Sequence, residues 1–253
     1  MIDLHCHLLP GVDDGSRSVE QSVRVLESMR DGGVTAVCLT PHFAASRVAQ
    51  GIPESHDAAF RALGPRAPQG IRLLRGVELM LDRPVTEELR TRPGLTLGGT
   101  KFVLVEFTRL AAAPAVASAL VQIVRLGLIP VLAHPERYAA TTPTTVWQWR
   151  SLGAVMQVDA TTLFQPSSRG KRARELVAHG LADILAADNH GDTRSVLGPY
   201  RMLCEHGGEA AAQLLLVKNP GAILAEEALE AVPPVAIKTG LITRLRELFE
   251  TED

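Results

Sequence analysis

The sequence predicts an α/β protein whose strands run parallel. Short apolar runs alternate with helical patterns along the chain, and the repeated order of strand, crossover helix and strand gives parallel strands with right-handed connections. The 253 residues are 46% hydrophobic but only 4% aromatic, so aliphatic side chains must fill the core, as in sheets covered by helices on both faces. Because α/β barrels of about 200–250 residues commonly form one domain, the expected organisation is a single domain spanning residues 1–253.

The expected elements follow one another with little chain left over. The seven expected strands are Ile2–Cys6, Thr35–Leu39, Ile71–Val77, Phe102–Phe107, Ile129–Ala133, Ala154–Val158 and Asp183–Ala187. The expected helices are Val19–Arg30, Ser55–Leu63, Ala115–Leu126, Thr145–Leu152 and Ser168–His179, with C-terminal helices from about residue 197. The first helix has the clearest signals, because Ser18 and Gln21 have capping-box spacing and Gly32-Gly33 ends the apolar pattern.

Charge and composition exclude several classes of protein. The 26 Lys and Arg against 28 Asp and Glu give a net charge of -2, which predicts no binding to nucleic acid or to anionic membranes. The N-terminal residues lack the basic and apolar regions of an export signal, so we expect a cytoplasmic protein. The most apolar stretch, residues 110–132, is interrupted by Pro114, Arg125 and Pro130, so no membrane insertion is expected. The three cysteines form no C-x-x-C metal motif.

Histidines and carboxylates gather where the expected strands end. Every expected strand except the sixth ends in, or is followed by, at least one histidine or carboxylate that could bind a metal. The sixth strand leads into Asp159, which is not taken as a candidate ligand. The candidates are His5, His7, His42, Glu78, Glu106, His134, Asp188 and His190. A single histidine or carboxylate at a strand end is more often a structural residue. However, the carboxyl ends of parallel strands lie on one face of the barrel, so these side chains should come together. Buried together, these groups would be costly without cations, so the pattern predicts a multinuclear metal site.

The same residues exclude other chemistries. A donor set of imidazoles and carboxylates without thiolates suits Mn, Fe or Zn. Cys6 alternates away from His5 and His7, and is expected in the core. The thiolate-phosphatase pattern H-C-x5-R is broken by Val12 at its arginine position, and no phosphate-binding glycine loop is present. Glu106 stands where amidohydrolases usually carry a modified lysine.

These motifs resemble the polymerase-and-histidinol-phosphatase (PHP) superfamily, whose fold is a distorted seven-stranded (β/α)7 TIM-like barrel with three metals. Within it, several segments closely resemble the CpsB-type bacterial tyrosine-protein phosphatases, from residue 1 to about residue 228. These segments are Met1–His7 with Val12-Asp13-Asp14-Gly15, Ala133–Tyr138, Ala187–His190 and Lys218-Asn219-Pro220.

The resemblance implies a role for each candidate residue and three divalent ions per chain, Mn first, with Fe or Zn as alternatives. His5, His7, Glu78 and Asp188 would hold one ion. Glu78 would bridge to a second, held also by Glu106 and His134, and Asp14, His42 and His190 would hold the third. Spacing alone does not choose between Asp13 and Asp14; the family pattern favours Asp14. Arg137 and Arg194 match the phosphate-binding arginines, with a surface arginine as the other interpretation of Arg194.

The activity implied is hydrolysis of phosphotyrosine on a tyrosine autokinase that controls capsular or exopolysaccharide synthesis. The nucleophile would be a hydroxide held between two metals, with no covalent protein intermediate; no residue is identified as a general acid. One alternative is a PHP phosphatase acting on histidinol phosphate or another small molecule. Another is a non-catalytic, metal-stabilised interaction module. Charges at Arg24, Glu27 and Arg30 leave open either a homo-oligomer or an ordinary solvated helix face.

Overall fold

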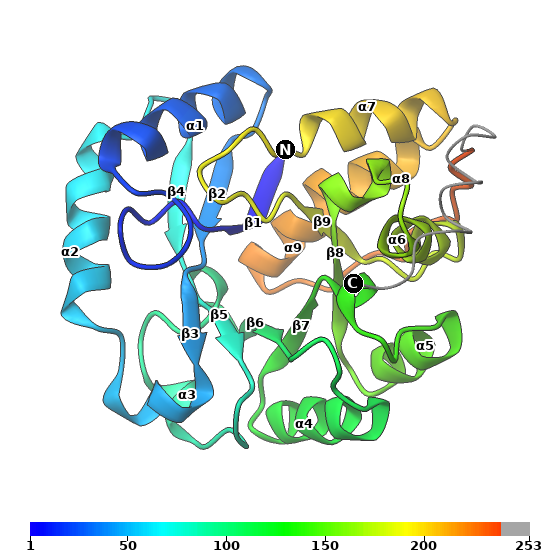
Figure 1. The fold of residues 1–253 in the computed structure, drawn as a ribbon, viewed down its shortest axis with the longest axis horizontal. Coiled ribbons are helices and arrows are strands. Elements are labelled where there is room, and N and C mark those ends of the chain that lie inside the picture. Colours follow the sequence, from blue (N-terminus) through cyan, green and yellow to red (C-terminus); the bar gives the residue numbers. More distant parts are fainter. Residues whose placement is uncertain (239–253) are drawn as a thin grey trace.

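The structure, a computed structural model that describes residues 1–238, contains two parallel sheets surrounded by helices (Figure 1). The first has the order β1 (Ile2–Cys6), β2 (Ala36–Leu39) and β4 (Arg72–Arg75). The second has the order β3 (His42–Ala44), β5 (Glu78–Met80), β6 (Phe102–Glu106), β7 (Ile129–Ala133), β8 (Val155–Asp159) and β9 (Ile184–Ala186). Every strand pair is parallel, which confirms the α/β prediction.

The strand pairing does not close the expected distorted seven-stranded barrel, because the strands form two separate sheets. Two expected strands continue into short second strands, β3 and β5, and the ladder is broken beside Pro41, which has no N–H to donate. Backbone bonds from Gly76 N to Leu39 O, 3.0 Å, and from Glu78 N to Pro41 O, 3.1 Å, still link the two parts. At the other junction, β1 meets the segment after β9 through one isolated bridge, Cys6 to Asn189. In residues 1–238, the sheet is therefore interrupted at both places.

The helices lie on the outside of the strands (Figure 1). They are α1 (Val19–Asp31), α2 (Glu54–Leu63), α3 (Glu88–Thr91), α4 (Ala113–Arg125), α5 (Pro143–Ser151), α6 (Ser168–Ala178), α7 (Leu197–Glu205), α8 (Glu209–Gln213) and α9 (Asn219–Ala225). Ser18 caps α1 through Gln21 N, but the Gln21 side chain accepts from Arg17 N rather than closing the expected capping box. No helix within the described range has the length and apolar character needed to cross a membrane.

The side chains that face inward from β6, β8 and β9 change from apolar to polar toward the carboxyl ends of the strands. An inner cluster of buried residues includes Phe102 and Leu104 of β6, Val155 of β8 and Ile184 of β9. Because side chains alternate, the same inward positions further along these strands carry polar groups. These inward polar residues are Glu106, Gln157, Asp159 and Asp188. The apolar layer therefore forms a floor beneath the polar end of the strands.

We predict that this floor contributes strongly to stability. Replacing Leu104 with Ala should lower the free energy of unfolding by about 2–5 kcal/mol, because Leu104 is only 1% exposed and its neighbours cannot fill the space. Val124→Ala on α4 is the control, since Val124 is 38% exposed and should change stability by about 0.5 kcal/mol or less. Urea unfolding of both variants checks this, and equal losses would contradict the assignment of the core.

Candidate metal centre

All nine candidate ligand residues lie together at the carboxyl ends of the strands. Four groups of them place potential ligand atoms within 4.8 Å of one another. The groups are His5, His7 and Asp188; His5, Glu78 and His134; His42, Glu78 and Glu106; and His7, Asp14, His42 and His190. Residues far apart in the sequence thus meet in one place, because they end or follow several different strands.

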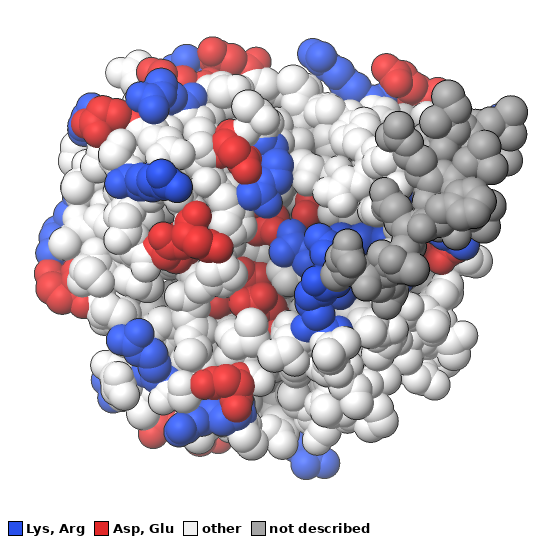
Figure 2. Space-filling model, in the orientation of Figure 1, with Lys and Arg blue, Asp and Glu red and all other residues white. Residues whose placement is uncertain are grey.

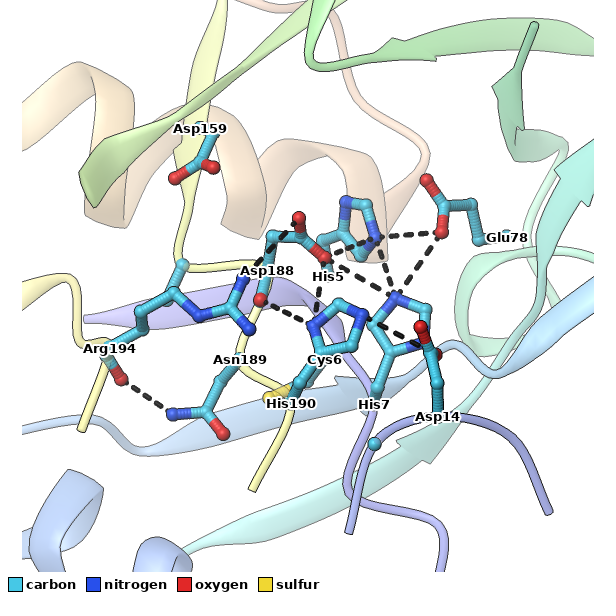
Figure 3. Close-up of polar contacts among 12 residues, drawn as sticks. His5, Cys6, His7, Asp14, Glu78, Asp159, Asp188, Asn189, His190 and Arg194 are labelled. Carbon is cyan, nitrogen blue, oxygen red and sulfur yellow. Dashed lines mark hydrogen bonds and ion pairs between the residues drawn. The ribbon is translucent and has the colours of Figure 1, made fainter. Parts of the chain in front are cut away.

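The side chains of the first group point toward one another and toward Glu78 (Figure 3). The Nε2 atoms of His5 and His7 are 3.1 Å apart. Each lies 3.2–3.3 Å from Glu78 Oε2 and 3.3 Å from Asp188 Oδ1. Ligand atoms about 2.0–2.1 Å from one ion in tetrahedral coordination are about 3.3–3.4 Å apart. The measured distances are close to that spacing, and all four side chains are buried.

Two further residues orient these imidazoles. Gln157 Oε1 lies 2.8 Å from His5 Nδ1, and Asp13 Oδ2 lies 2.8 Å from His7 Nδ1. Both partners are acceptors in this arrangement, so the Nδ1 atoms donate and the neutral rings present Nε2 lone pairs to the cluster. Four acceptor atoms then converge with no donor among them. Within residues 1–238, Asp188 Oδ1 is buried and has no hydrogen-bond partner, which fits an oxygen that binds a cation.

The chain alone can relieve this arrangement only by holding additional protons. Burial would lower the pKa of His5 and of His7, but Glu78 and Asp188, together with Asp13 beside His7, raise both above their ordinary values. Burial would likewise raise the pKa of Glu78, but the surrounding imidazoles, His5 foremost, hold it well below its ordinary value. A divalent cation supplies the same positive charge without protons, so the donor set fits a metal ion.

Glu78 lies at the junction of the groups. Its Oε1 is 2.7 Å from His134 Nε2, whereas its Oε2 faces His5, His7 and, at 3.0 Å, His42 Nδ1. Glu106 Oε1 lies 3.1 Å from the same His42 nitrogen, and Glu106 Oε2 lies 3.9 Å from His134 Nε2. The two oxygens of Glu78 therefore face two different sets of donors, as a bridging carboxylate requires.

The last group separates Asp13 from Asp14. Asp14 Oδ1 lies 3.4 Å from His42 Nε2 and 3.5 Å from His190 Nε2. His190 donates through Nδ1 to the carbonyl of Asp188, 2.9 Å, which leaves its Nε2 as an acceptor. Asp13 instead binds His7 and the backbone N–H groups of Gly15 and His42. Asp14 thus lies among the potential ligand atoms of this group, whereas Asp13 contacts His7 through the other ring nitrogen, Nδ1.

Two of the candidate ligands have left-handed backbones. His134 has a φ of 34° and Asp188 a φ of 48°, and Glu226 is the only other non-glycine residue within residues 1–238 with a positive φ. Such conformations are unfavourable for most residues and persist where surrounding contacts impose them. Here Asp188 N donates to His5 O at 3.1 Å, which holds the turn against β1. This strain aims both side chains into the cluster.

Both predicted arginines lie beside Asp188. Arg137 donates through Nη2 to Asp188 Oδ2 and, at 2.9 Å, to Asp159 Oδ2. Its Nε is buried and has no hydrogen-bond partner in the described part of the chain. Arg194 Nη1 lies 3.7 Å from Asp188 Oδ2, and its Nε donates to Asp192 at 2.8 Å. A carboxylate of the candidate metal cluster thus also positions the guanidinium groups next to it.

Sequence reasoning missed residues that support the cluster. The strand-end pattern identifies neither Gln157, which contacts His5, nor Asp159, which holds Arg137. Buried Asp3 was also missed; it accepts from the backbone N–H of Ala187, 3.2 Å, and so joins β1 to the end of β9. The alternation of β8 places Gln157 and Asp159 on the inward side, and this signal could have identified both. Cys6 packs in the core, as expected.

Comparisons with known proteins agree with this geometry. The family described as capsular polysaccharide synthesis, CpsB/CapC, matches residues 1–225. The tyrosine-protein phosphatase CpsB of Streptococcus agalactiae is 28% identical over 238 residues, which cover 88% of this chain and 98% of that protein. The tyrosine-protein phosphatase YwqE of Bacillus subtilis is 27% identical over 256 residues, covering 94% of this chain and 97% of the relative.

The fold is also similar to a solved structure. It comes from work on YwqE from Bacillus subtilis and CpsB from Streptococcus pneumoniae, described there as unique metal-dependent tyrosine phosphatases. The similarity has a TM-score of 0.77 at 25% identity and covers 94% of this chain and all of the other. These matches confirm the resemblance noted in the sequence: the chain belongs to the CpsB/CapC family of capsular polysaccharide synthesis.

Proposed function

We propose that this protein is a metal-dependent protein-tyrosine phosphatase that acts on a bacterial tyrosine autokinase in the control of capsular or exopolysaccharide synthesis. The observation that carries the proposal is the convergence of His5, His7, Glu78 and Asp188 on one point beside two arginines. The names of the family's characterised members support the substrate. We further propose a cytoplasmic, single-domain enzyme whose two sheets together correspond to a distorted seven-stranded barrel.

Three divalent ions, Mn first and Fe or Zn as alternatives, complete the proposal. His5, His7, Glu78 and Asp188 would hold the first. Glu78, Glu106 and His134 would hold the second, and Asp14, His42 and His190 the third. Bound ions of this kind lower the pKa of water and stabilise negative charge on phosphoryl oxygens. The Nδ1 of His42 would then donate to Glu106 while its Nε2 serves the third ion.

The chain's own residues would bind and orient the phosphate. Burial would lower the pKa of Arg137, but Asp188 and Asp159 raise it, so the guanidinium stays charged. Arg137 uses Nη2 for those two carboxylates, so another N–H group of its guanidinium would donate to a phosphate oxygen. Arg194, in the loop between β9 and α7, would approach the phosphate from the other side of Asp188. The leaving group of phosphotyrosine is a phenolate, whose parent phenol has a pKa of about 10. It leaves more readily than an alkoxide, so a strong general acid is less necessary.

A substrate panel tests the function. Turnover of a phosphotyrosine peptide should exceed that of histidinol phosphate and of a nucleotide monophosphate. A clear preference for histidinol phosphate would favour the small-molecule PHP phosphatase instead. Absence of turnover on every phosphomonoester, by protein with its metals present, would favour the non-catalytic interaction module.

Removal of metal should abolish hydrolysis of p-nitrophenyl phosphate, and Mn should restore it. His134→Ala should lower turnover about 100-fold or more, because a bound ion supplies several kcal/mol of transition-state stabilisation. His179→Ala is the matched control, since His179 is exposed at the end of α6. Metal content and circular dichroism should accompany the assay. Full activity in metal-free protein would contradict the proposal.

The two aspartates should differ in metal binding. Asp14→Ala should lower the number of ions retained, because Asp14 is a proposed ligand of the third ion. Asp13→Ala should keep that number but weaken affinity about 10–100-fold, as loss of a residue that orients a ligand does. Elemental analysis and calorimetric titration with Mn distinguish these outcomes, with Asp31→Ala as a surface control. The reverse pattern would exchange the two roles.

A further inference from the structure

Basic side chains gather beside the acidic centre of the site. In Figure 2, Asp and Glu side chains lie at the centre of this face, and Lys and Arg side chains lie next to them. Arg137 follows β7, and Arg169 lies in the first turn of α6. The two segments are joined by Arg172 Nε, which donates to the carbonyl of Glu136 at 2.9 Å. The start of α6 therefore adjoins the loop that carries Arg137.

The start of α6 has an unusual charge pattern. Its first turn holds no acidic residue, although carboxylates are the groups favoured at the positive end of a helix dipole. Arg169 and Lys171 lie in that turn instead, and Arg172 follows directly. Ser167 caps the helix through Gly170 N at 3.1 Å, so the backbone is arranged normally. The basic residues thus oppose the helix dipole rather than compensate it.

Arg169 is partly buried at the start of α6. Burial lowers its pKa, as do the like charges of Arg137 and Arg109. The nearest acids give little compensation, since Asp159 already accepts from Arg137. Among residues 1–238, no carboxylate lies within ion-pair distance of Arg169. Positive charge kept at such a position is typical of an anion-binding site.

Exposed apolar side chains accompany the arginines. Leu110, next to Arg109, is 85% exposed, and Phe164, just before α6, is 52% exposed. Ala139 N donates to Arg109 O at 2.9 Å, so this loop lies against the segment after Arg137. Basic and apolar groups together suit a polypeptide better than an isolated small phosphate ester.

We propose that Arg169 binds an acidic side chain of the substrate protein close to the phosphotyrosine whose phosphate Arg137 holds. The inference rests on the proposed phosphatase function and adds to it a preference for acidic sequence around the target tyrosine. A chain advances about 3.3–3.6 Å per extended residue, so an Asp or Glu within a few positions of the phosphotyrosine can reach the neighbouring arginine.

The test compares two phosphotyrosine peptides of the same length, one with Asp or Glu beside the phosphotyrosine and one with Asn or Gln there. For the wild-type protein with its metals, kcat/KM should be about tenfold higher for the acidic peptide, the size expected for one charge-assisted contact. Arg169→Gln should bring this ratio close to one, and Arg169→Lys should restore part of it. Lys171→Gln, which removes the same charge from an exposed position on α6, should leave the ratio unchanged.

Two further measurements separate binding from a structural role. The wild-type ratio should fall with added salt, because the Debye length shortens from about 10 Å at 0.1 M to about 3 Å at 1 M. The melting temperature of Arg169→Gln should stay the same or rise, because the variant removes an unfavourable charge. Equal loss on both peptides, or no wild-type preference, would overturn the inference while leaving the phosphatase function intact. Failure of the wild-type protein to cleave any phosphotyrosine peptide would overturn both.

Discussion

The structure depends on one electrostatic constraint, the burial of Glu78 among four imidazoles. Its Oε1 lies 2.7 Å from His134, and its Oε2 lies within 3.3 Å of His5, His7 and His42. The neutral imidazoles of His5 and His7, whose Nδ1 atoms donate to Gln157 and Asp13, offer no proton to this carboxylate. The cluster must then take up protons or cations. The perturbed pKa values of His5, His7 and Glu78 express that requirement, and metal binding satisfies it at neutral pH.

The surrounding residues keep this arrangement in place. Asp13 and Gln157 set the orientation of two imidazoles, and Asp3 joins the first strand to the last. The left-handed backbones of His134 and Asp188 show that local conformational preference has been overridden to aim these side chains. Asp188 also contacts Arg137, so any shift of the cluster would move this guanidinium with it. One carboxylate therefore couples the geometry of the cluster to the position of Arg137.

Much of the fold was predictable because its signals are local. Short apolar runs between helical patterns predict seven strands, and the structure has a strand within each predicted range. The helix α1 begins after Ser18, as its capping residue predicts. Two features were not predictable from spacing. A second strand, β3, follows β2 after Pro41, beyond the end of the expected strand Thr35–Leu39, and the Gln21 side chain turns to Arg17 instead of completing the capping box. Both depend on which backbone groups lie opposite, and this is decided only when the segments pack together.

The candidate site divides in the same way between sequence and structure. The kinds of ligand, imidazole and carboxylate, and their places after successive strands follow from the sequence, since parallel strands must bring their carboxyl ends to one face. The sequence does not distinguish the roles of Asp13 and Asp14, because adjacent residues have nearly the same spacing from the other candidate ligands. Only the packed structure turns Asp13 toward His7 and Asp14 toward His42 and His190. It also brings Gln157 to His5 across 152 positions of the chain, a contact that no local pattern encodes.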